Sequence, residues 1–176
     1  MFSFNRKFSA TDIELLHFLG NVRLFQDLSD VQKLAFAPYL HLRTYKQNEV
    51  VFFRNDPSQA LYLIKEGRLS LELDIKEHFE SVIQLETFAT FGHNSLLPKT
   101  KRIFNAFVTS PLCQIYVLPQ VNILDVFKRT PEIKAQVLEN LSCIYNQNLY
   151  DLCKIYREKQ GFFELGEMFT NVVWGT

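Results

Sequence analysis

The sequence has no excess of either charge and no long apolar run, and these two absences exclude several protein classes. Lys plus Arg and Asp plus Glu both total 19 among 176 residues, which leaves no basic surplus for nucleic acid or an anionic membrane. No stretch approaches the roughly 20 apolar residues of a membrane span, and no apolar run behind Arg6 and Lys7 is long enough for a signal peptide. We therefore expect a cytoplasmic protein with no direct contact to nucleic acid or membrane.

Cysteine is scarce, and its pattern excludes a disulfide framework. The three cysteines are odd in number, and Cys143 and Cys153 lie too far apart along a predicted helix to bridge. Cys113 falls in a predicted strand. We expect reduced thiols, most of them buried.

The sequence also lacks the motifs of common catalytic and metal sites. Its four histidines, His17, His41, His78 and His93, form neither His-x-His nor His-x-x-x-His, the spacings that bring two imidazoles to one metal. A Gly-x-Ser-x-Gly elbow, a glycine-rich phosphate loop and a Cys-x-x-Cys pair are all missing. We expect no enzyme activity, no metal and no bound cofactor.

Core-forming residues are abundant, at 47% hydrophobic with 17 Phe. This content of hydrophobic residues and the length of 176 residues suit one domain. We predict a single domain over residues 1–160 and an apolar C-terminal tail over residues 161–176.

The hydrophobic period predicts helices, then strands, then helices. Thr11-Asp12-Ile13-Glu14 has a capping-box pattern that opens a short helix ended by Gly20, and a second helix is predicted from about Ser29 towards Pro38. A period of two then predicts strands at residues 50–53, 61–64, 69–75, 82–85, 106–108 and 115–118. Short strands at this spacing favour a jelly-roll-like sandwich or barrel. Helices are predicted at residues 121–129 and, with Pro131 in its first turn, from 131 to about 160.

The segment from Phe91 to Arg102 carries the clearest functional pattern. A compact phosphate is held by backbone N–H groups at the start of a helical turn and by one bidentate Arg. Gly92 would let the backbone turn, Phe91 would anchor it and Arg102 would supply the donors. The pattern resembles the phosphate-binding cassette of the cyclic nucleotide-binding domain family, which includes catabolite activators and kinase regulatory subunits, in the residues Phe91-Gly92-His93-Asn94-Ser95-Leu96-Leu97 and Lys101-Arg102.

The resemblance extends over most of the chain, with landmarks in family order at residues 24–29, 45–52 and 61–69. Asn48 and Asn55 replace family glycines, and Asn accepts a left-handed backbone more readily than other residues with a side chain. Phe88 replaces a third glycine. The resemblance implies a mainly β fold with flanking α, a jelly-roll-like β-roll (double-stranded β-helix) between N-terminal helices and a long C-terminal helix. The roll and its flanking helices would occupy about residues 22–128, and the long helix residues 131–160.

The cassette departs from the family where the ribose would bind. His93 replaces the Glu that accepts from the ribose hydroxyl, and Ile103 and Phe104 replace small residues after the Arg. An unpaired polar group in a buried site costs about 1–3 kcal/mol. We predict a degenerate cassette that does not bind cyclic AMP or cyclic GMP in the usual way, and either a pocket filled by its own side chains or a site for another anion. The ligand-binding residues of such a site would be Phe91, Gly92, His93, Asn94, Ser95, Leu96, Arg102 and Ile103.

A stripe along the long helix predicts a homodimer. Apolar residues recur at steps of three and four with one Asn among them, as in coiled-coil seams that fix register. The stripe consists of Val137, Leu141, Ile144, Asn148, Leu152 and Ile155. The alternative is that this face packs on the roll or under the tail. By resemblance, the helix also covers the pocket in members that sense nucleotides.

The tail is too apolar for a disordered end, because residues 162–174 include three Phe and Trp174. It would form extra core, dock on a protein partner, or plug the pocket through Phe169 or Trp174. Its 16 residues are too few for the helix-turn-helix module that related transcription factors append. We therefore expect a stand-alone regulatory module in signalling. The rival prediction is a dimeric interaction scaffold with a self-filled pocket, which would recruit a protein through the long helix or the tail. A third alternative is a DNA regulator that acts through a separate chain.

Overall fold

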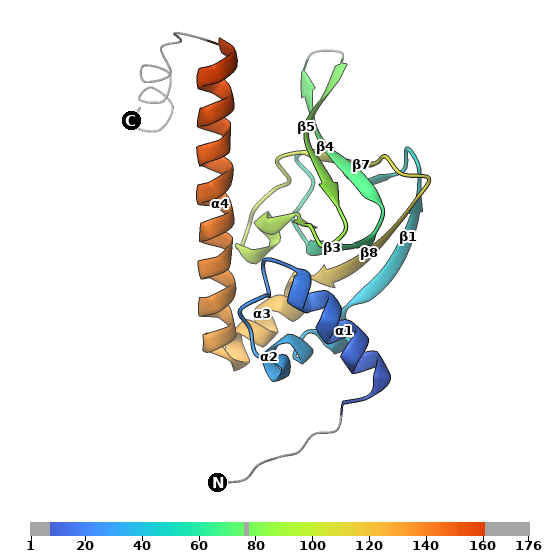
Figure 1. The fold of residues 1–176 in the computed structure, drawn as a ribbon, viewed down its shortest axis with the longest axis vertical. Coiled ribbons are helices and arrows are strands. Elements are labelled where there is room, and N and C mark those ends of the chain that lie inside the picture. The colour runs from blue at the N-terminus through green and yellow to red at the C-terminus, as the bar shows by residue number, and fades with distance from the viewer. Residues whose placement is uncertain (1–7, 76–77, 161–176) are drawn as a thin grey trace. The chain divides into compact units, whose positions relative to one another are not determined.

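The computed structural model describes residues 8–75 and 78–160 (Figure 1). The chain divides into two compact units, Met1–Leu141 and Ser142–Thr176. The predicted tail at residues 161–176, with Phe169 and Trp174, lies outside the described residues, so its proposed roles stay predictions.

The N-terminal helices begin at serine caps. α1 (Ala10–Asn21) starts at Ser9, whose hydroxyl accepts from the Asp12 N–H at 3.1 Å while the Asp12 carboxylate accepts from the Ser9 N–H at 3.0 Å. The predicted capping box at Thr11 is therefore wrong by two residues, because Ser9 and Asp12 already form the reciprocal pair. α2 (Asp30–Leu34) starts at Ser29 as predicted, and the 3-10 turn η1 (Ala37–Tyr39) follows it.

In the described residues, eight strands form two four-stranded sheets in which every pair is antiparallel. One sheet has the order β1 (His41–Lys46), β8 (Leu112–Pro119), β3 (Ala60–Glu66) and β6 (Thr90–Phe91). The other has the order β2 (Val50–Phe52), β7 (Asn105–Val108), β4 (Arg68–Ile75) and β5 (His78–Glu86). The predicted fold class, a β-roll with flanking helices, is confirmed.

The core of the roll is closed by aliphatic residues of both sheets and by three aromatic rings. Among the fully buried residues are Ile64, Leu69, Ala106 and Ile115, and burying such an aliphatic side chain stabilises the fold by about 1.5–3 kcal/mol. The three rings belong to Phe52, Tyr62 and Phe91, and their centroids lie 5.0 to 5.8 Å apart. This aromatic cluster borders the cassette.

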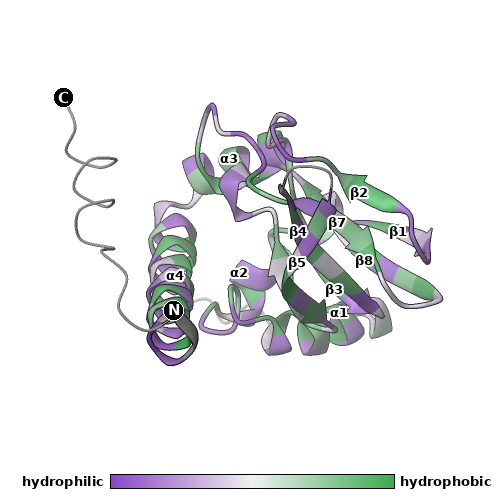
Figure 2. Ribbon diagram, turned by 90° about the horizontal axis from the view of Figure 1, so that it is seen from above, coloured by the Kyte–Doolittle hydropathy of each residue, from purple (hydrophilic) through white to green (hydrophobic). Residues whose placement is uncertain are grey.

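Two helices follow the strands, α3 (Gln120–Arg129) and α4 (Pro131–Gln160), close to the predicted bounds. Both carry hydrophobic and hydrophilic residues in turn along the ribbon (Figure 2). The start of α4 belongs to the first unit, where Val137 is fully buried and Asn140 donates a 3.2 Å hydrogen bond to the Leu24 carbonyl. None of the helices that the structure describes is long and apolar enough to cross a membrane.

The family glycine positions keep a left-handed backbone although their residues differ. Asn48 and Asn55 both have φ of 69°, which confirms that Asn preserves these turns. Phe88 has φ of 70°, a conformation that costs a bulky residue about 1–3 kcal/mol. Its ring packs 5.7 Å from that of Phe18, and this contact offsets part of the strain.

The cysteines are free, but the expectation that most are buried is wrong. Cys113 is buried in β8, and this burial raises the pKa of its thiol to about 11. Cys143 and Cys153 are exposed on α4. The helical pattern predicts that both cysteines lie on one helix, but it does not predict which face of the helix carries them.

Candidate functional site

The cassette begins at a sharp backbone turn between β6 and the 3-10 turn η2 (His93–Leu96). Phe91 is buried, as expected of an anchor, and Gly92 adopts the left-handed conformation with φ of 74°. A Cβ atom at Gly92 would collide with Nη1 of Arg102 and approach the Ala60 carbonyl oxygen to 3.2 Å. The glycine therefore makes room for the arginine.

Arg102 is held inside the protein, and only 3% of the residue is exposed. Its Nη1 donates to the Gly92 carbonyl at 3.0 Å, and its Nη2 donates to the Ala60 carbonyl at 2.7 Å. Its carbon Cζ lies 4.3 Å from the ring centroid of Phe52 and 5.3 Å from that of Tyr62, in the range of cation–π attraction. Both carbonyls and both rings belong to the protein itself.

Arg102 has no ion-pair partner among the described carboxylates. Burial lowers the pKa of its guanidinium, and Tyr62 and Asp56 partly oppose this shift. A buried cation without a counter-charge is costly unless dipoles and ring faces replace its water. Here the two carbonyl dipoles and the ring faces of Phe52 and Tyr62 replace the water around the guanidinium.

Three buried side-chain atoms in the described residues have no hydrogen-bond partner: Ser58 Oγ, Ser95 Oγ and Arg102 Nε. Ser95 and Arg102 belong to the cassette itself. Ser58 donates its N–H to the Thr100 carbonyl at 3.0 Å, and Ser95 lies within η2. Each unpaired polar group costs about 1–3 kcal/mol, and no described protein group offsets that cost at these three atoms.

His93, which we predict to replace the ribose-binding Glu of the family, is a neutral imidazole near neutral pH. Burial lowers its pKa to about 4. Its Nε2 lies 2.7 Å from Thr90 Oγ1, at hydrogen-bond distance. The side chain therefore brings no negative charge to the cassette.

The remaining cassette residues divide between buried and exposed positions. Asn94 accepts from Thr100 Oγ1 through its carbonyl at 2.5 Å, and Leu96 is buried. Ile103 is 54% exposed and does not fill the interior, whereas Phe104 packs against the core of the roll. The groups that contact Arg102 in the interior are instead Phe52 and Tyr62.

Sequence reasoning missed Phe52 and Tyr62 as neighbours of the cassette. The signal lies in strand register, because Tyr62 pairs directly with Phe91 across β3 and β6. It also missed Gln120, whose Nε2 donates to the Ser95 carbonyl at 2.8 Å and to the Leu97 carbonyl at 3.0 Å. These bonds tie the cassette to the start of α3.

The predicted dimer stripe is divided by the structure. Val137 and Leu141 are buried within the first unit, and Ile144 is also buried. Further along α4, Asn148 is exposed, and Leu152 and Ile155 are 62% and 51% exposed. Only the distal part of the stripe is accessible on this chain.

The family model described as Cyclic nucleotide-binding domain matches residues 42–130, just over half of the chain. The chain belongs to the cyclic nucleotide-binding domain family. The matched segment includes the whole cassette and Arg102, which confirms the resemblance seen in the sequence. Domains of this family are regulatory modules rather than catalysts. No curated protein matches the chain significantly.

Several solved structures share the fold. The regulatory domain of Toxoplasma gondii PKA, crystallised with cAMP, is 18% identical with a TM-score of 0.60, over 70% of this chain and 46% of that one. The Thermus thermophilus catabolite activator protein is 26% identical with a TM-score of 0.63, over 74% of this chain and 59% of that one. The sensor domain of the transcriptional regulator DNR from Pseudomonas aeruginosa is 18% identical with a TM-score of 0.66, over 80% of this chain and 95% of that one. The chain thus spans about half the length of the PKA domain that it matches.

Proposed function

We propose that this chain is a regulatory module whose cassette is held closed by its own Arg102, and that it does not take cyclic AMP or cyclic GMP in the usual way. The observation that supports this proposal is the buried guanidinium, which donates to the carbonyls of Gly92 and Ala60 and lies over Phe52. In the family the equivalent arginine is the counter-charge of the cyclic phosphate. In this chain its Nη1 and Nη2 donate to the protein backbone.

A nucleotide would have to displace these contacts. If the guanidinium turned to a phosphate, the Ala60 carbonyl would lose this donor, at about 1–3 kcal/mol for a buried group left unpaired, and the Gly92 carbonyl would keep only the Ser95 N–H at 3.0 Å. The ribose would meet the neutral His93 in place of a carboxylate. Both effects weaken nucleotide binding, and each 1.4 kcal/mol lowers affinity about tenfold.

A second candidate function is the sensing of a small oxyanion. The observation that favours it is the group of unpartnered donors at Ser58, Ser95 and Arg102. An anion such as phosphate could accept from Arg102 Nε and the serine hydroxyls while Nη1 and Nη2 keep their carbonyls. This binding would need no ribose contact, so the replacement by His93 would not oppose it.

We also propose that the distal part of α4 pairs with a second copy of the chain. Tyr145, Leu149, Leu152 and Ile155 are exposed there, and Asn148 lies among them. Such large apolar side chains on one helix favour association. Light scattering is expected to give a dimer, and Leu152→Glu together with Ile155→Glu is expected to give a monomer. If the wild-type chain is a monomer in light scattering, this apolar face would instead bind a different protein.

Calorimetry with cyclic AMP, cyclic GMP and inorganic phosphate tests the cassette. We expect no heat from either nucleotide up to millimolar concentration, in wild type and in the control Lys101→Ala, whose side chain is exposed. Micromolar nucleotide binding that Arg102→Ala abolishes would overturn the closed cassette. Phosphate binding lost in Ser95→Ala but kept in Lys101→Ala would support the oxyanion function, and silence with phosphate would exclude it.

A further inference from the structure

An apolar groove lies beside the end of η2, and Arg102 does not line it. We call it the η2 groove. Its volume is about 560 Å³, inside the range of roughly 300–1,000 Å³ typical of small-molecule sites. Its walls come from the cassette, from α3 and from the first turns of α4, all within the first unit.

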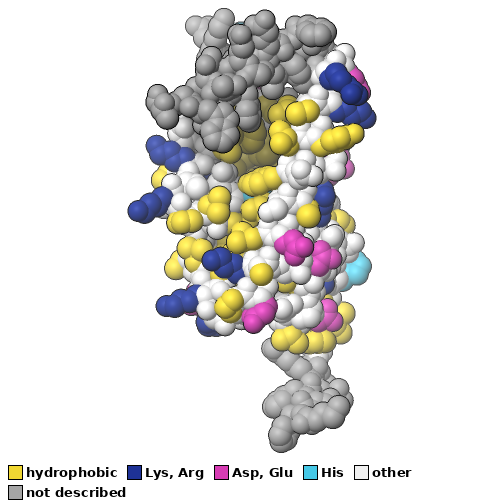
Figure 3. All heavy atoms as spheres, turned by 90° about the vertical axis from the view of Figure 1, so that its left-hand side faces the viewer, with side chains coloured by type: hydrophobic (Ala, Val, Ile, Leu, Met, Phe, Trp, Pro, Cys, Tyr) yellow, Lys and Arg dark blue, Asp and Glu magenta, His cyan; other side chains and the backbone are white. Residues whose placement is uncertain are grey.

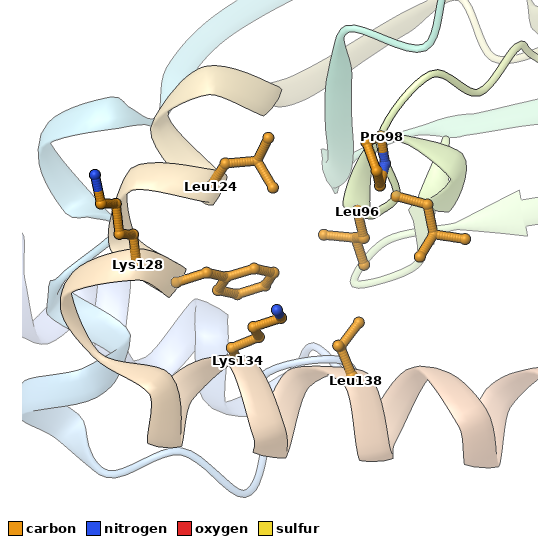
Figure 4. Close-up of a pocket in the computed structure, with 8 residues that line it drawn as sticks. Leu96, Pro98, Leu124, Lys128, Lys134 and Leu138 are labelled. Carbon is orange, nitrogen blue, oxygen red and sulfur yellow. The ribbon is translucent and has the colours of Figure 1, made fainter.

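The apolar lining has a buried part and an accessible part. Leu96 and Phe127 are buried, whereas Leu97 and Leu124 are 46% and 39% exposed. Leu96, Leu124 and Leu138, each from a different element, surround one shared space (Figure 4). The groove therefore offers accessible leucine surface above an apolar base.

Hydrogen bonds fix the two facing walls to each other. Gln120, at the start of α3, donates to the Ser95 and Leu97 carbonyls at 2.8 and 3.0 Å. Thr100 Oγ1 donates to the same Leu97 carbonyl at 3.3 Å. Because α3 also carries Leu124 and Phe127, the groove is formed before any ligand arrives, which reduces the ordering cost of binding.

The charged groups of the groove are both cationic. Lys128 and Lys134 belong to its lining, no acidic residue does, and neither lysine forms an ion pair with a residue that the structure describes. Asp125, the acidic residue of α3, is engaged by Arg129 at 2.7 Å. On the wider face that carries α4, basic, acidic and hydrophobic side chains all lie close together (Figure 3). The site therefore complements a molecule with an apolar chain and one anionic end.

We propose that the η2 groove binds a medium-chain fatty carboxylate from solution. The acyl chain lies against Leu96, Leu124 and Phe127, and the carboxylate is held by Lys134, whose amino group points toward the groove while that of Lys128 points away from it (Figure 4). This inference is independent of the closed cassette, because Arg102 and His93 are not part of the groove.

The first experiment is calorimetry with octanoate and decanoate below their micelle concentrations. We expect saturable binding at one site per chain. Two added methylene groups are expected to raise affinity about tenfold, because each contributes about 0.8 kcal/mol when buried. Octanol, which keeps the chain but lacks the charge, is expected to bind more weakly than octanoate. Excess cyclic AMP is expected not to displace decanoate.

Two sets of variants locate the ligand. Leu124→Gln is expected to lower decanoate affinity about tenfold or more, whereas Leu112→Gln, at an exposed leucine of β8 outside the groove, leaves it unchanged. Lys134→Gln is expected to lower decanoate affinity about fivefold and to leave octanol affinity unchanged. Lys46→Gln is the matched control for lost charge. Equal unfolding midpoints establish that each variant is folded.

Three results would overturn the proposal. One is the absence of heat with millimolar decanoate. Another is decanoate binding that Leu124→Gln does not weaken. A third is octanol binding as tight as octanoate binding, with neither affinity changed by Lys134→Gln. If decanoate gives no heat but Leu124→Gln changes the oligomeric state in light scattering, the groove is a contact between copies of the chain.

Discussion

Arg102 donates from Nη2 to the carbonyl oxygen of Ala60 at 2.7 Å, and this bond joins the end of the cassette to the first residue of β3. Nη1 of the same guanidinium donates to the carbonyl oxygen of Gly92, near the start of the cassette. One side chain therefore connects three segments of the roll, and its removal is expected to affect stability.

The turn at Gly67 is expected to tolerate no side chain. Its φ is 101°, and an added Cβ would lie 2.6 Å from the Leu112 carbonyl oxygen and 2.8 Å from Cys113 Cα, both backbone atoms. We expect Gly67→Ala to lower the free energy of unfolding by about 3 kcal/mol. Gly20→Ala is the control, because it lies in α1 with no neighbour closer than 4.0 Å, and it is expected to stabilise the protein by up to about 1 kcal/mol. Equal effects of the two changes in urea unfolding would contradict this account.

The stability of the fold is expected to depend on pH through His93. Its folded pKa of about 4 lies below the ordinary value of 6.5, so the unfolded chain binds the proton more readily. The stabilisation is present above pH 6.5 and is lost as pH falls towards 4. His93→Gln is expected to reduce this loss between pH 7 and about 4.5. A profile unaffected by His93→Gln would show that the imidazole titrates normally.

The three thiols are expected to react at two different rates. Cys143 and Cys153 are exposed, whereas Cys113 is buried and its pKa is raised to about 11. Because the thiolate is the reactive form, a thiol reagent at neutral pH should modify two cysteines quickly and the third only after denaturant is added. Cys113→Ser should leave the fast phase intact. Equal modification rates for all three cysteines would contradict the burial of Cys113.

The sequence predicted the roll well because most of its strands have a clear period of two. β4 alternates apolar and polar residues over its length, and Asn48 and Asn55 mark turns that the structure confirms. β1 was missed because its side chains are mostly exposed, so no apolar alternation marks it. β6 was missed because it has only two residues.

The cassette was predicted in position but not in its internal contacts. The spacing from Gly92 to Arg102 identified the family, yet no sequence pattern says whether a guanidinium faces a ligand site or the carbonyls of Gly92 and Ala60. That choice depends on Phe52 and Tyr62, which come from two other strands. Likewise, the stripe on α4 was visible as a period, but only the packing of the first unit shows that Val137 and Leu141 are used as core.

Urea unfolding of Arg102→Ala, compared with Lys101→Ala, tests the closed cassette most directly. If Arg102 holds the cassette shut, its removal lowers the free energy of unfolding by about 2–4 kcal/mol, because two hydrogen bonds from a charged donor are lost, while Lys101→Ala stays within about 0.5 kcal/mol of wild type. Arg102→Lys should recover only part of the loss, since an ammonium cannot bond both carbonyls from one plane. An Arg102→Ala variant as stable as wild type, or more stable, would contradict the account and mark Arg102 as a residue kept for a ligand.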